Sequence, residues 1–360
     1  MYTITLKKTS SMKPSILDQG SLSTFLKTIG EKPYRIAQIT QAIFKGSVTS
    51  LNDITTLPED LRIALNEYFC ILPLSVASDQ LSIDGTNKVL FKTQDNMSIE
   101  SVLMRHKSSR LTLCISSQVG CPVKCVFCST GTMGFKRNLT ASEIVAQVLY
   151  FNQKLAPTDE RVRNIVFMGM GEPLLNYDNV MSAVKDFIDQ KKFGIGVRHV
   201  TISTSGVVPK IYQMIEEKIP VHLAVSLHAP NDALRTKIMP INNAYPLAQL
   251  IEALDKYNEK RDKRIFYEYV MLDGVNDLPI HAKELAHLIA HQLAHVNLIP
   301  YNPGGSWIDL KSSSRTKILA FQAEITKRNI PSTIRYTLGQ DIDAACGQLA
   351  AKENTSSPKL

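Results

Sequence analysis

The amino-acid sequence predicts an α/β fold. A parallel sheet is expected to curl into a partial (β/α)6 barrel, preceded by a small helical N-terminal accessory domain and a β-hairpin linker. Three observations predict this architecture. Six short apolar segments with strand character alternate with helical patterns across residues 111–299. A cysteine-rich loop directly follows the first segment, and glycine or polar residues follow four of the later ones. Barrels of this kind carry their chemistry at the carboxyl ends of the strands, so the pattern predicts one functional edge.

Residues 1–86 are expected to form the helical accessory domain. Apolar residues recur three and four positions apart in 33–44, and Gly46 supplies a stop for that helix. A second helical pattern covers 57–69 and opens with Pro58, a residue favoured in the first turn. The domain is a candidate for handling RNA, with structural packing as the alternative.

Residues 87–110 are expected to form the hairpin connector, because two strand patterns there flank Asp95-Asn96. The remaining chain divides into a barrel core with a catalytic C-terminal segment, 111–349, and a polar, loose tail, 350–360. The six barrel strands are expected at 111–117, 164–168, 199–203, 221–226, 264–271 and 295–299.

Two further patterns concern the helices of the barrel. Thr140 and Glu143 form a capping box that opens a helix. His287, His291 and His295 are spaced four residues apart, which would align them on one helical face. A metal site would usually need a carboxylate beside them, as in H-E-x-x-H, so the row is interpreted as a polar helix face.

The loop after the first barrel strand contains Cys121, Cys125 and Cys128 in a C-x3-C-x2-C arrangement. A four-iron, four-sulfur cube is held by soft thiolates brought together on short loops. This loop can hold three irons and leave the fourth open to a ligand that is not protein. A structural zinc site is the alternative, with Cys114 as a fourth ligand. Six cysteines in 360 residues do not indicate a disulfide framework.

Other strand ends carry residues suited to a bound cofactor. Gly171 permits close approach of the backbone, and Glu172 offers an acceptor for an ammonium group. Similar positions follow the third, fourth and sixth strands, namely Ser203, Ser226, His228 and Asn302. Any one of them alone would be an ordinary loop residue, but their repeated placement at one edge indicates a shared site.

Composition narrows the class of protein. The net charge is +8 and the sequence pI is about 9.0, which favours polyanionic partners without requiring them. Hydrophobic residues make up 44%, enough for a well-filled core. The first residues lack the apolar stretch of a signal peptide, and no run of about 18 apolar residues predicts a membrane span. Free-looking thiols and an oxygen-sensitive cluster indicate the cytoplasm.

Several stretches together closely resemble the RlmN/Cfr family of radical S-adenosylmethionine (SAM) methyltransferases. They include Leu113-Cys114-Ile-Ser-Ser-Gln-Val-Gly-Cys121, Gly-Met-Gly-Glu-Pro-Leu-Leu-Asn176, Ser-Leu-His-Ala-Pro230 and Asp341-Ile-Asp-Ala-Ala-Cys346-Gly-Gln-Leu349. The resemblance spans about residues 34–349 and implies that SAM occupies the open iron of a [4Fe-4S] cluster. The cluster ligands implied are Cys121, Cys125 and Cys128. The SAM contacts implied are Gly171, Glu172, Ser203, Ser226, Leu227, His228 and Asn302.

The resemblance also implies an unusual route that uses two SAM molecules per turnover. One SAM methylates Cys346. The second, reduced through the cluster by a donor such as flavodoxin or ferredoxin, gives a 5′-deoxyadenosyl radical that takes hydrogen from the S-methyl group. The methylene radical adds to an adenine ring, Glu100 matches the base that removes the ring proton, and Cys114 releases the RNA by forming a transient disulfide with Cys346. Without the resemblance, Cys114 would be interpreted as a buried small hydrophobe and Glu100 as a solvent-facing carboxylate.

The substrate implied is adenosine 2503 of 23S rRNA. In the RlmN branch the methyl group goes to C2, and some members also modify adenosine 37 of tRNA; in the Cfr branch it goes to C8 and confers antibiotic resistance. The motifs look like the RlmN form, although Arg335-Tyr-Thr-Leu-Gly-Gln-Asp departs from the arginine-rich pattern expected there. Two alternatives remain: a radical SAM enzyme acting on a small molecule or peptide, and a zinc-stabilised RNA-binding module.

Overall fold

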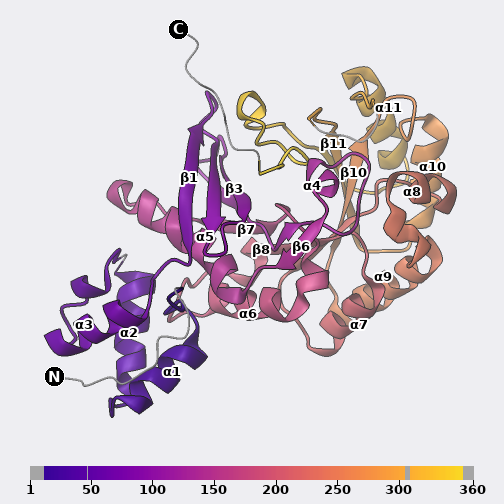
Figure 1. Cartoon of the computed structure of the whole chain (residues 1–360). Helices are drawn as coiled ribbons and strands as arrows, with labels where there is room; N and C mark the ends of the chain where they lie inside the picture. Colours follow the sequence, from indigo (N-terminus) through magenta and orange to yellow (C-terminus); the bar gives the residue numbers. More distant parts are fainter. Residues whose placement is uncertain (1–11, 47, 305–308, 352–360) are drawn as a thin grey trace, which may run out of the picture.

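The computed structural model describes residues 12–46, 48–304 and 309–351. The predicted tail beyond residue 351 therefore lies outside the described residues. A helical N-terminal unit is followed by one continuous, curved sheet, whose strands run through the rest of the chain (Figure 1). No described helix has the length and apolar character needed to cross a bilayer.

The N-terminal unit consists of α1 (Gln19–Thr28), α2 (Tyr34–Lys45) and α3 (Glu59–Tyr68). Both predicted helices are present, with Gly46 as the C-cap of α2 and Pro58 preceding α3. The unit is packed onto the barrel, because the Phe44 and Phe193 rings meet edge to face with their centroids 5.0 Å apart. One apolar core runs through both parts.

Three antiparallel strands link this unit to the barrel: β1 (Leu74–Leu81), β2 (Asn87–Thr93) and β3 (Ser98–Arg105). The predicted hairpin is the β2–β3 pair, with the turn at Asp95-Asn96. β1 is an additional strand that the sequence pattern did not predict, because most of its residues are exposed and no apolar alternation marks it.

The barrel strands follow one another around the sheet in chain order, and each is parallel to the one before. All six predicted strands are present, so the partial (β/α)6 barrel is confirmed. A short seventh strand, β12 (Ser332–Ile334), pairs with the last of them. The six are β4 (Leu111–Cys114), β7 (Asn164–Phe167), β8 (Val200–Thr204), β9 (His222–Ser226), β10 (Ile265–Met271) and β11 (Ala294–Pro300).

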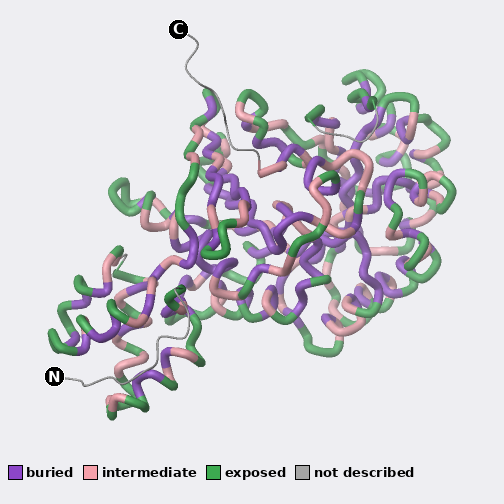
Figure 2. Tube along the Cα trace, viewed as in Figure 1, coloured by how far each residue is buried: buried purple, intermediate pink, exposed green. Residues whose placement is uncertain are grey.

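Helices cover the outside of the sheet, and the buried residues lie along the strands between them (Figure 2). The capping box predicted at Thr140 and Glu143 opens the first of these helices. At the functional edge are the short helix α4 (Ser129–Thr132) and a small hairpin of β5 (Gln118–Gly120) and β6 (Phe135–Asn138). The covering helices are α5 (Ala141–Leu155), α6 (Tyr177–Ile188), α7 (Val208–Glu216), α8 (Asp232–Ile238), α9 (Leu247–Arg261), α10 (Pro279–Leu288) and α11 (Arg315–Thr326).

The interpretation of His287, His291 and His295 as one helical face was wrong. α10 ends at Leu288, because the chain must turn to begin β11, where Ala294 pairs with Ile265 of β10. His291 instead lies 2.8 Å from a carboxylate oxygen of Asp255, and the His295 ring lies 2.8 Å from the Thr333 hydroxyl.

Candidate active site

The cysteine loop, Cys121 to Cys128, lies between β5 and α4. A close approach of two glycines fixes where it begins. Gly120 adopts φ +75°, and a Cβ on it would lie 1.7 Å from the Gly134 carbonyl oxygen. That carbonyl accepts a hydrogen bond from the Cys121 N–H at 3.2 Å. Only a residue without a side chain fits at position 120, so the hairpin geometry sets the backbone of the first cysteine.

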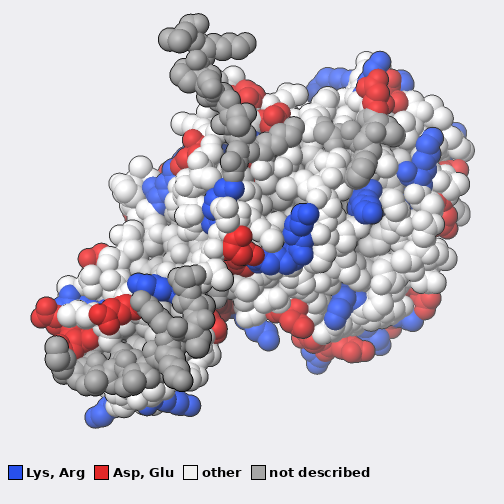
Figure 3. Space-filling model, viewed as in Figure 1, with Lys and Arg blue, Asp and Glu red and all other residues white. Residues whose placement is uncertain are grey.

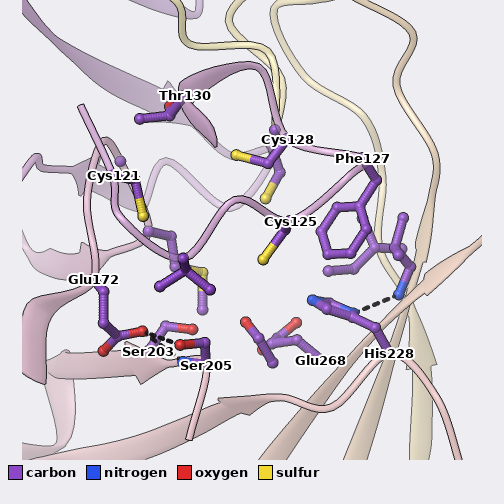
Figure 4. A pocket seen from close by; sticks show the side chains of 18 of the residues that line it. Cys121, Cys125, Phe127, Cys128, Thr130, Glu172, Ser203, Ser205, His228 and Glu268 are labelled. Atoms are coloured by element: carbon purple, nitrogen blue, oxygen red, sulfur yellow. Dashed lines mark hydrogen bonds between the residues drawn. The ribbon is translucent and has the colours of Figure 1, made fainter. Parts of the chain in front are cut away.

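The three cysteines of this loop face one cavity (Figure 4). Across the described residues, no three His, Cys, Asp or Glu side chains converge closely enough to ligate a single metal ion. A [4Fe-4S] cube does not require that convergence, because each thiolate binds a different iron. Cys114, the fourth ligand of the zinc alternative, does not line the cavity. The donor set therefore fits a three-thiolate cluster better than tetrahedral zinc.

Burial disfavours the thiolate form of Cys121 and Cys125. It raises the pKa of Cys121 to about 12, and it raises the pKa of Cys125 as well. Both side chains are still partly accessible from the cavity. Because the thiolate is the metal ligand, assembly of a cluster here must release protons.

The cavity contains about 980 Å³ of space free of atoms, counted out into the solvent at its open mouth. Strand ends form one wall, and the cysteine loop and the C-terminal segment form the other. The lining combines three thiols with polar and apolar side chains, a mixture that suits a cluster with a cofactor beside it. Six of the predicted SAM contacts line the cavity, namely Gly171, Glu172, Ser203, Ser226, His228 and Asn302.

Leu227 is the predicted SAM contact that does not line the cavity. Its side chain is fully buried in the main apolar core, and its N–H donates to the Glu268 carbonyl at 3.1 Å. Leu227 therefore faces the apolar core, whereas its neighbours Ser226 and His228 line the cavity.

Glu172 is a buried carboxylate held in place by its neighbours (Figure 4). One oxygen accepts from the Ser205 N–H at 2.6 Å and the Ser205 hydroxyl at 2.7 Å; the other accepts from the Leu174 N–H at 3.0 Å. Burial raises the pKa of Glu172, and these hydrogen bonds oppose that rise. Gly171 precedes it at φ +104°, and a Cβ there would lie 2.6 Å from Gln118. The glycine thus lets the backbone before Glu172 pack against Gln118 of β5.

His228 is a neutral hydrogen-bond donor facing the cavity. Its Nδ1 accepts from the Val270 N–H at 2.9 Å, which leaves the proton on Nε2. Burial, with the nearby Arg235 charge, lowers the pKa of His228 to about 3. Its ring packs edge to face on Phe127 at a centroid distance of 4.7 Å, joining the fourth strand end to the cysteine loop.

Two charged residues of the site were missed by the sequence reasoning. Arg235 is completely buried and donates to the carbonyls of Ser205 at 2.6 Å and Leu227 at 3.2 Å. Glu268, on β10, lines the cavity and lies 3.5 Å from the Arg335 guanidinium. A charged residue within the apolar strand 265–271 was the available signal for Glu268. Arg235 had none, because backbone carbonyls, such as those of Ser205 and Leu227, accept hydrogen bonds whatever side chain they carry.

Cys346 lies in a turn of the C-terminal segment and lines the same cavity as the three loop cysteines. The thiol of Cys346 is exposed to the interior of the cavity, but the surrounding protein shields it from bulk solvent. This shielding, together with the nearby Cys128 and Glu268, raises the pKa of Cys346 to about 12. Asn302 donates to the Cys346 carbonyl at 3.3 Å. The structure therefore brings the predicted methylated cysteine to the predicted cofactor site.

Cys114 and Glu100 lie behind this segment and do not line the cavity. Cys114 pairs with Val102 across β4 and β3, and Glu100 is two residues from Val102, so both side chains share one face of the sheet. Burial raises the pKa of Cys114, and the nearby Cys346 adds to the rise. One Glu100 oxygen accepts from the N–H groups of residues 350 and 351 at 2.9 and 3.0 Å.

Comparisons with known proteins agree with this geometry. Residues 115–286 match the Radical SAM superfamily, and residues 16–71 match the ribosomal RNA large subunit methyltransferase N-terminal domain. The chain is 44% identical over 351 residues to a probable dual-specificity RNA methyltransferase RlmN of Bacillus licheniformis, covering 96% of each. It is 46% identical over 344 residues to the protein of that name from Geobacillus kaustophilus, covering 94% of this chain and 93% of the relative.

A solved structure gives the same result. The crystal structure of a radical SAM methyltransferase from Sphaerobacter thermophilus superposes with a TM-score of 0.91 at 42% identity, covering 94% of this chain and 100% of that one. The three-thiolate loop, the partial barrel and the near full-length relatives agree. The chain belongs to the RlmN family of radical SAM methyltransferases, enzymes that use a [4Fe-4S] cluster and SAM.

Proposed function

We propose that this protein methylates C2 of adenosine in RNA, at adenosine 2503 of 23S rRNA and at adenosine 37 of tRNA, through a methylated Cys346. The observation that carries the proposal is that Cys346 lines the cavity formed by the cluster cysteines and the SAM-facing strand ends. The related proteins named above are RlmN proteins with dual specificity, which favours C2 over the C8 chemistry of the Cfr branch.

A bound cluster and SAM would supply reductive cleavage of the sulfonium, and with it the removal of hydrogen from an unactivated methyl group. Cys121, Cys125 and Cys128 would hold the cluster. Glu172 would accept from the SAM ammonium group, since its carboxylate is fixed at the cavity wall. The neutral His228 would donate from Nε2 to an acceptor in the cavity, because its Nδ1 already accepts from the Val270 N–H.

Release of the product would fall to two residues behind the cavity. Once the Cys114 thiol is deprotonated, it would attack the sulfur of Cys346. Glu100 would take the ring proton, but its carboxylate now accepts from backbone N–H groups of the C-terminal segment. The oxygen bound by residues 350 and 351 would become available as a base when these residues separate from it, while the other oxygen lies 3.4 Å from the Lys88 ammonium group.

RNA would bind around the cavity mouth. A groove lined by Arg315, Arg335 and Tyr336 shares Pro300 with the cavity, and the Tyr336 side chain is 86% exposed. Exposed aromatic rings stack on unpaired bases, and guanidinium groups bind phosphates. Basic side chains also gather over β6 (Figure 3), where Lys136 is exposed.

The remaining assignments follow from the same proposal. Residues 1–86 would help to bind the RNA. Residues 87–110 would connect this domain to the barrel, and residues 111–349 would contain the active site. The reductant would be a small electron carrier such as flavodoxin or ferredoxin. An oxygen-sensitive cluster would place the protein in the cytoplasm.

Nucleoside mapping tests the proposal. The chain is expressed in cells that lack their own adenosine-C2 methyltransferase, and the modified nucleotides are identified by mass spectrometry. We expect 2-methyladenosine with the natural chain and with Cys70→Ala, because Cys70 is remote from the cavity. Cys346→Ala should abolish it. 8-Methyladenosine would contradict the regiochemistry, and unmodified RNA would contradict the function.

A further inference from the structure

The turn between β1 and β2, residues 82–86, contacts the C-terminal segment that carries Cys346. Asp84 accepts the Gly339 N–H at 2.8 Å through one oxygen and the Thr86 N–H at 2.8 Å through the other. Asp341 accepts from the Ser82 hydroxyl at 2.5 Å and from the Ile83 N–H at 3.2 Å. Residues about 255 positions apart in the chain are thus joined by reciprocal carboxylate bonds.

Packing at this contact leaves little freedom. Gly339 adopts φ +66°, and a Cβ there would lie 2.8 Å from the Thr86 methyl carbon. Lys88, at the start of β2, reaches the Asp343 carbonyl at 3.4 Å. Burial acts to raise the pKa of Asp84, but the hydrogen bonds from Gly339 and Thr86 bring it below its ordinary value. The contact is therefore made with the carboxylate charged, and charged hydrogen bonds are the strong ones.

The opposite side of the segment is held by the cysteine loop and its surroundings. The Ser129 N–H donates to the Gly347 carbonyl at 2.8 Å, and the Thr130 hydroxyl donates to the Leu349 carbonyl at 2.7 Å. Cys346 therefore lies between the contacts of the 82–86 turn with residues 339–341 and the contacts that α4, Asn302 and Glu100 make with residues 346–351. Figure 1 shows the yellow segment running between the β1–β2 turn and α4. Without the contacts of the 82–86 turn, the chain on the N-terminal side of Cys346 would lose two of its anchors, so the thiol would be held firmly from the C-terminal side only.

We propose that the β1–β2 turn is a positioning element for the reactive thiol, with Ser82 and Asp84 as positioning residues that act on the reaction through residues 339–343. The inference rests on the proposed role of Cys346 and adds a task for β1 and its turn. Neither residue lines the cavity.

Asp84→Ala tests the inference, with Ser82→Ala as a second variant should the first fail to fold. Ile83→Ala is the matched control, because that side chain is 97% exposed and only its backbone N–H makes the contact. The first measurement is hydrogen–deuterium exchange of the 339–351 peptide in the cluster-loaded protein. We expect exchange to rise about 10-fold in Asp84→Ala, as expected for losing a bond to a charged acceptor, and to stay unchanged in Ile83→Ala.

The second measurement separates positioning from folding. The iron content per chain and the KM for RNA should match the natural protein in Asp84→Ala and Ser82→Ala, while kcat and the fraction of chains with S-methylated Cys346 fall about 10-fold. Unchanged exchange and unchanged kcat in both variants would overturn the inference, and so would equal losses in Ile83→Ala. Failure of the proposed function is distinguishable, since it would remove RNA methylation from the natural chain while leaving the exchange difference intact.

Discussion

Gly120→Ala should remove the cluster, whereas Gly134→Ala should not. Both glycines have positive φ, +75° and +68°, and both belong to the hairpin that presents the cysteine loop. An alanine pays a strain of about 1–2 kcal/mol at either position for that backbone conformation. At Gly134 nothing lies within 4 Å of the new methyl group, so this strain is the whole effect.

At Gly120 the methyl group would lie 1.7 Å from the Gly134 carbonyl oxygen, although side-chain carbons do not approach such atoms within 3.0 Å. One strand must therefore move by at least about 1.3 Å, which a close-packed interior resists. The displaced carbonyl is the acceptor of the Cys121 N–H. We expect the free energy of unfolding to fall by at least about 4 kcal/mol, a decrease typical of backbone strain combined with overpacking.

The assay is iron content per chain after anaerobic reconstitution, with urea unfolding of the same samples. Gly134→Ala should keep its full iron complement and lose about 1–2 kcal/mol. Gly120→Ala should lose most of its iron. Equal iron and equal stability in the two variants would refute the reasoning, because strain alone does not distinguish them.

Three other outcomes are expected. Arg235→Met should lower the free energy of unfolding by about 3–5 kcal/mol in a urea titration. The substitution leaves the buried carbonyls that accept hydrogen bonds from this guanidinium without a donor. The hydrogen bond from Arg137 is the chief cause that lowers the pKa of Asp95 to about 2. The contribution of Asp95 to the free energy of unfolding is therefore complete above about pH 4 and disappears as the pH falls towards 2; partial exposure limits this contribution to about 1 kcal/mol. Asp95→Asn should match the natural protein in stability at about pH 2 but be less stable at about pH 7. Tyr336→Ala should weaken RNA binding about 10-fold in a filter-binding titration, while Tyr336→Phe keeps it, because the ring stacks and the hydroxyl does not.

Local patterns predicted much of this molecule. The barrel strands and the capping box at Thr140 depend on neighbouring residues, and the cysteine spacing lies within one loop, so all could be inferred from short stretches. The histidine row was misjudged because the end of α10 is decided by the pairing of β11 with β10, which no local pattern contains.

Features that depend on distant contacts escaped prediction. Arg235 joins two strand ends through carbonyls, which leave no trace in composition. Glu100 was expected to be available as a base, but its carboxylate accepts from residues 350 and 351, about 250 positions away. The strand β1 is mostly exposed, so its sequence lacks the alternation of apolar and polar residues that predicts a strand.

The order of residues along the chain has a consequence for biosynthesis. The cysteine loop is complete once residue 128 has been translated, whereas the 339–351 segment that walls the cavity is added after every barrel strand. During synthesis the thiols of the nascent barrel thus face an uncovered depression through which iron and sulfide can be delivered. Attachment of the last segment then narrows this depression to the cavity of the complete chain, whose mouth remains open.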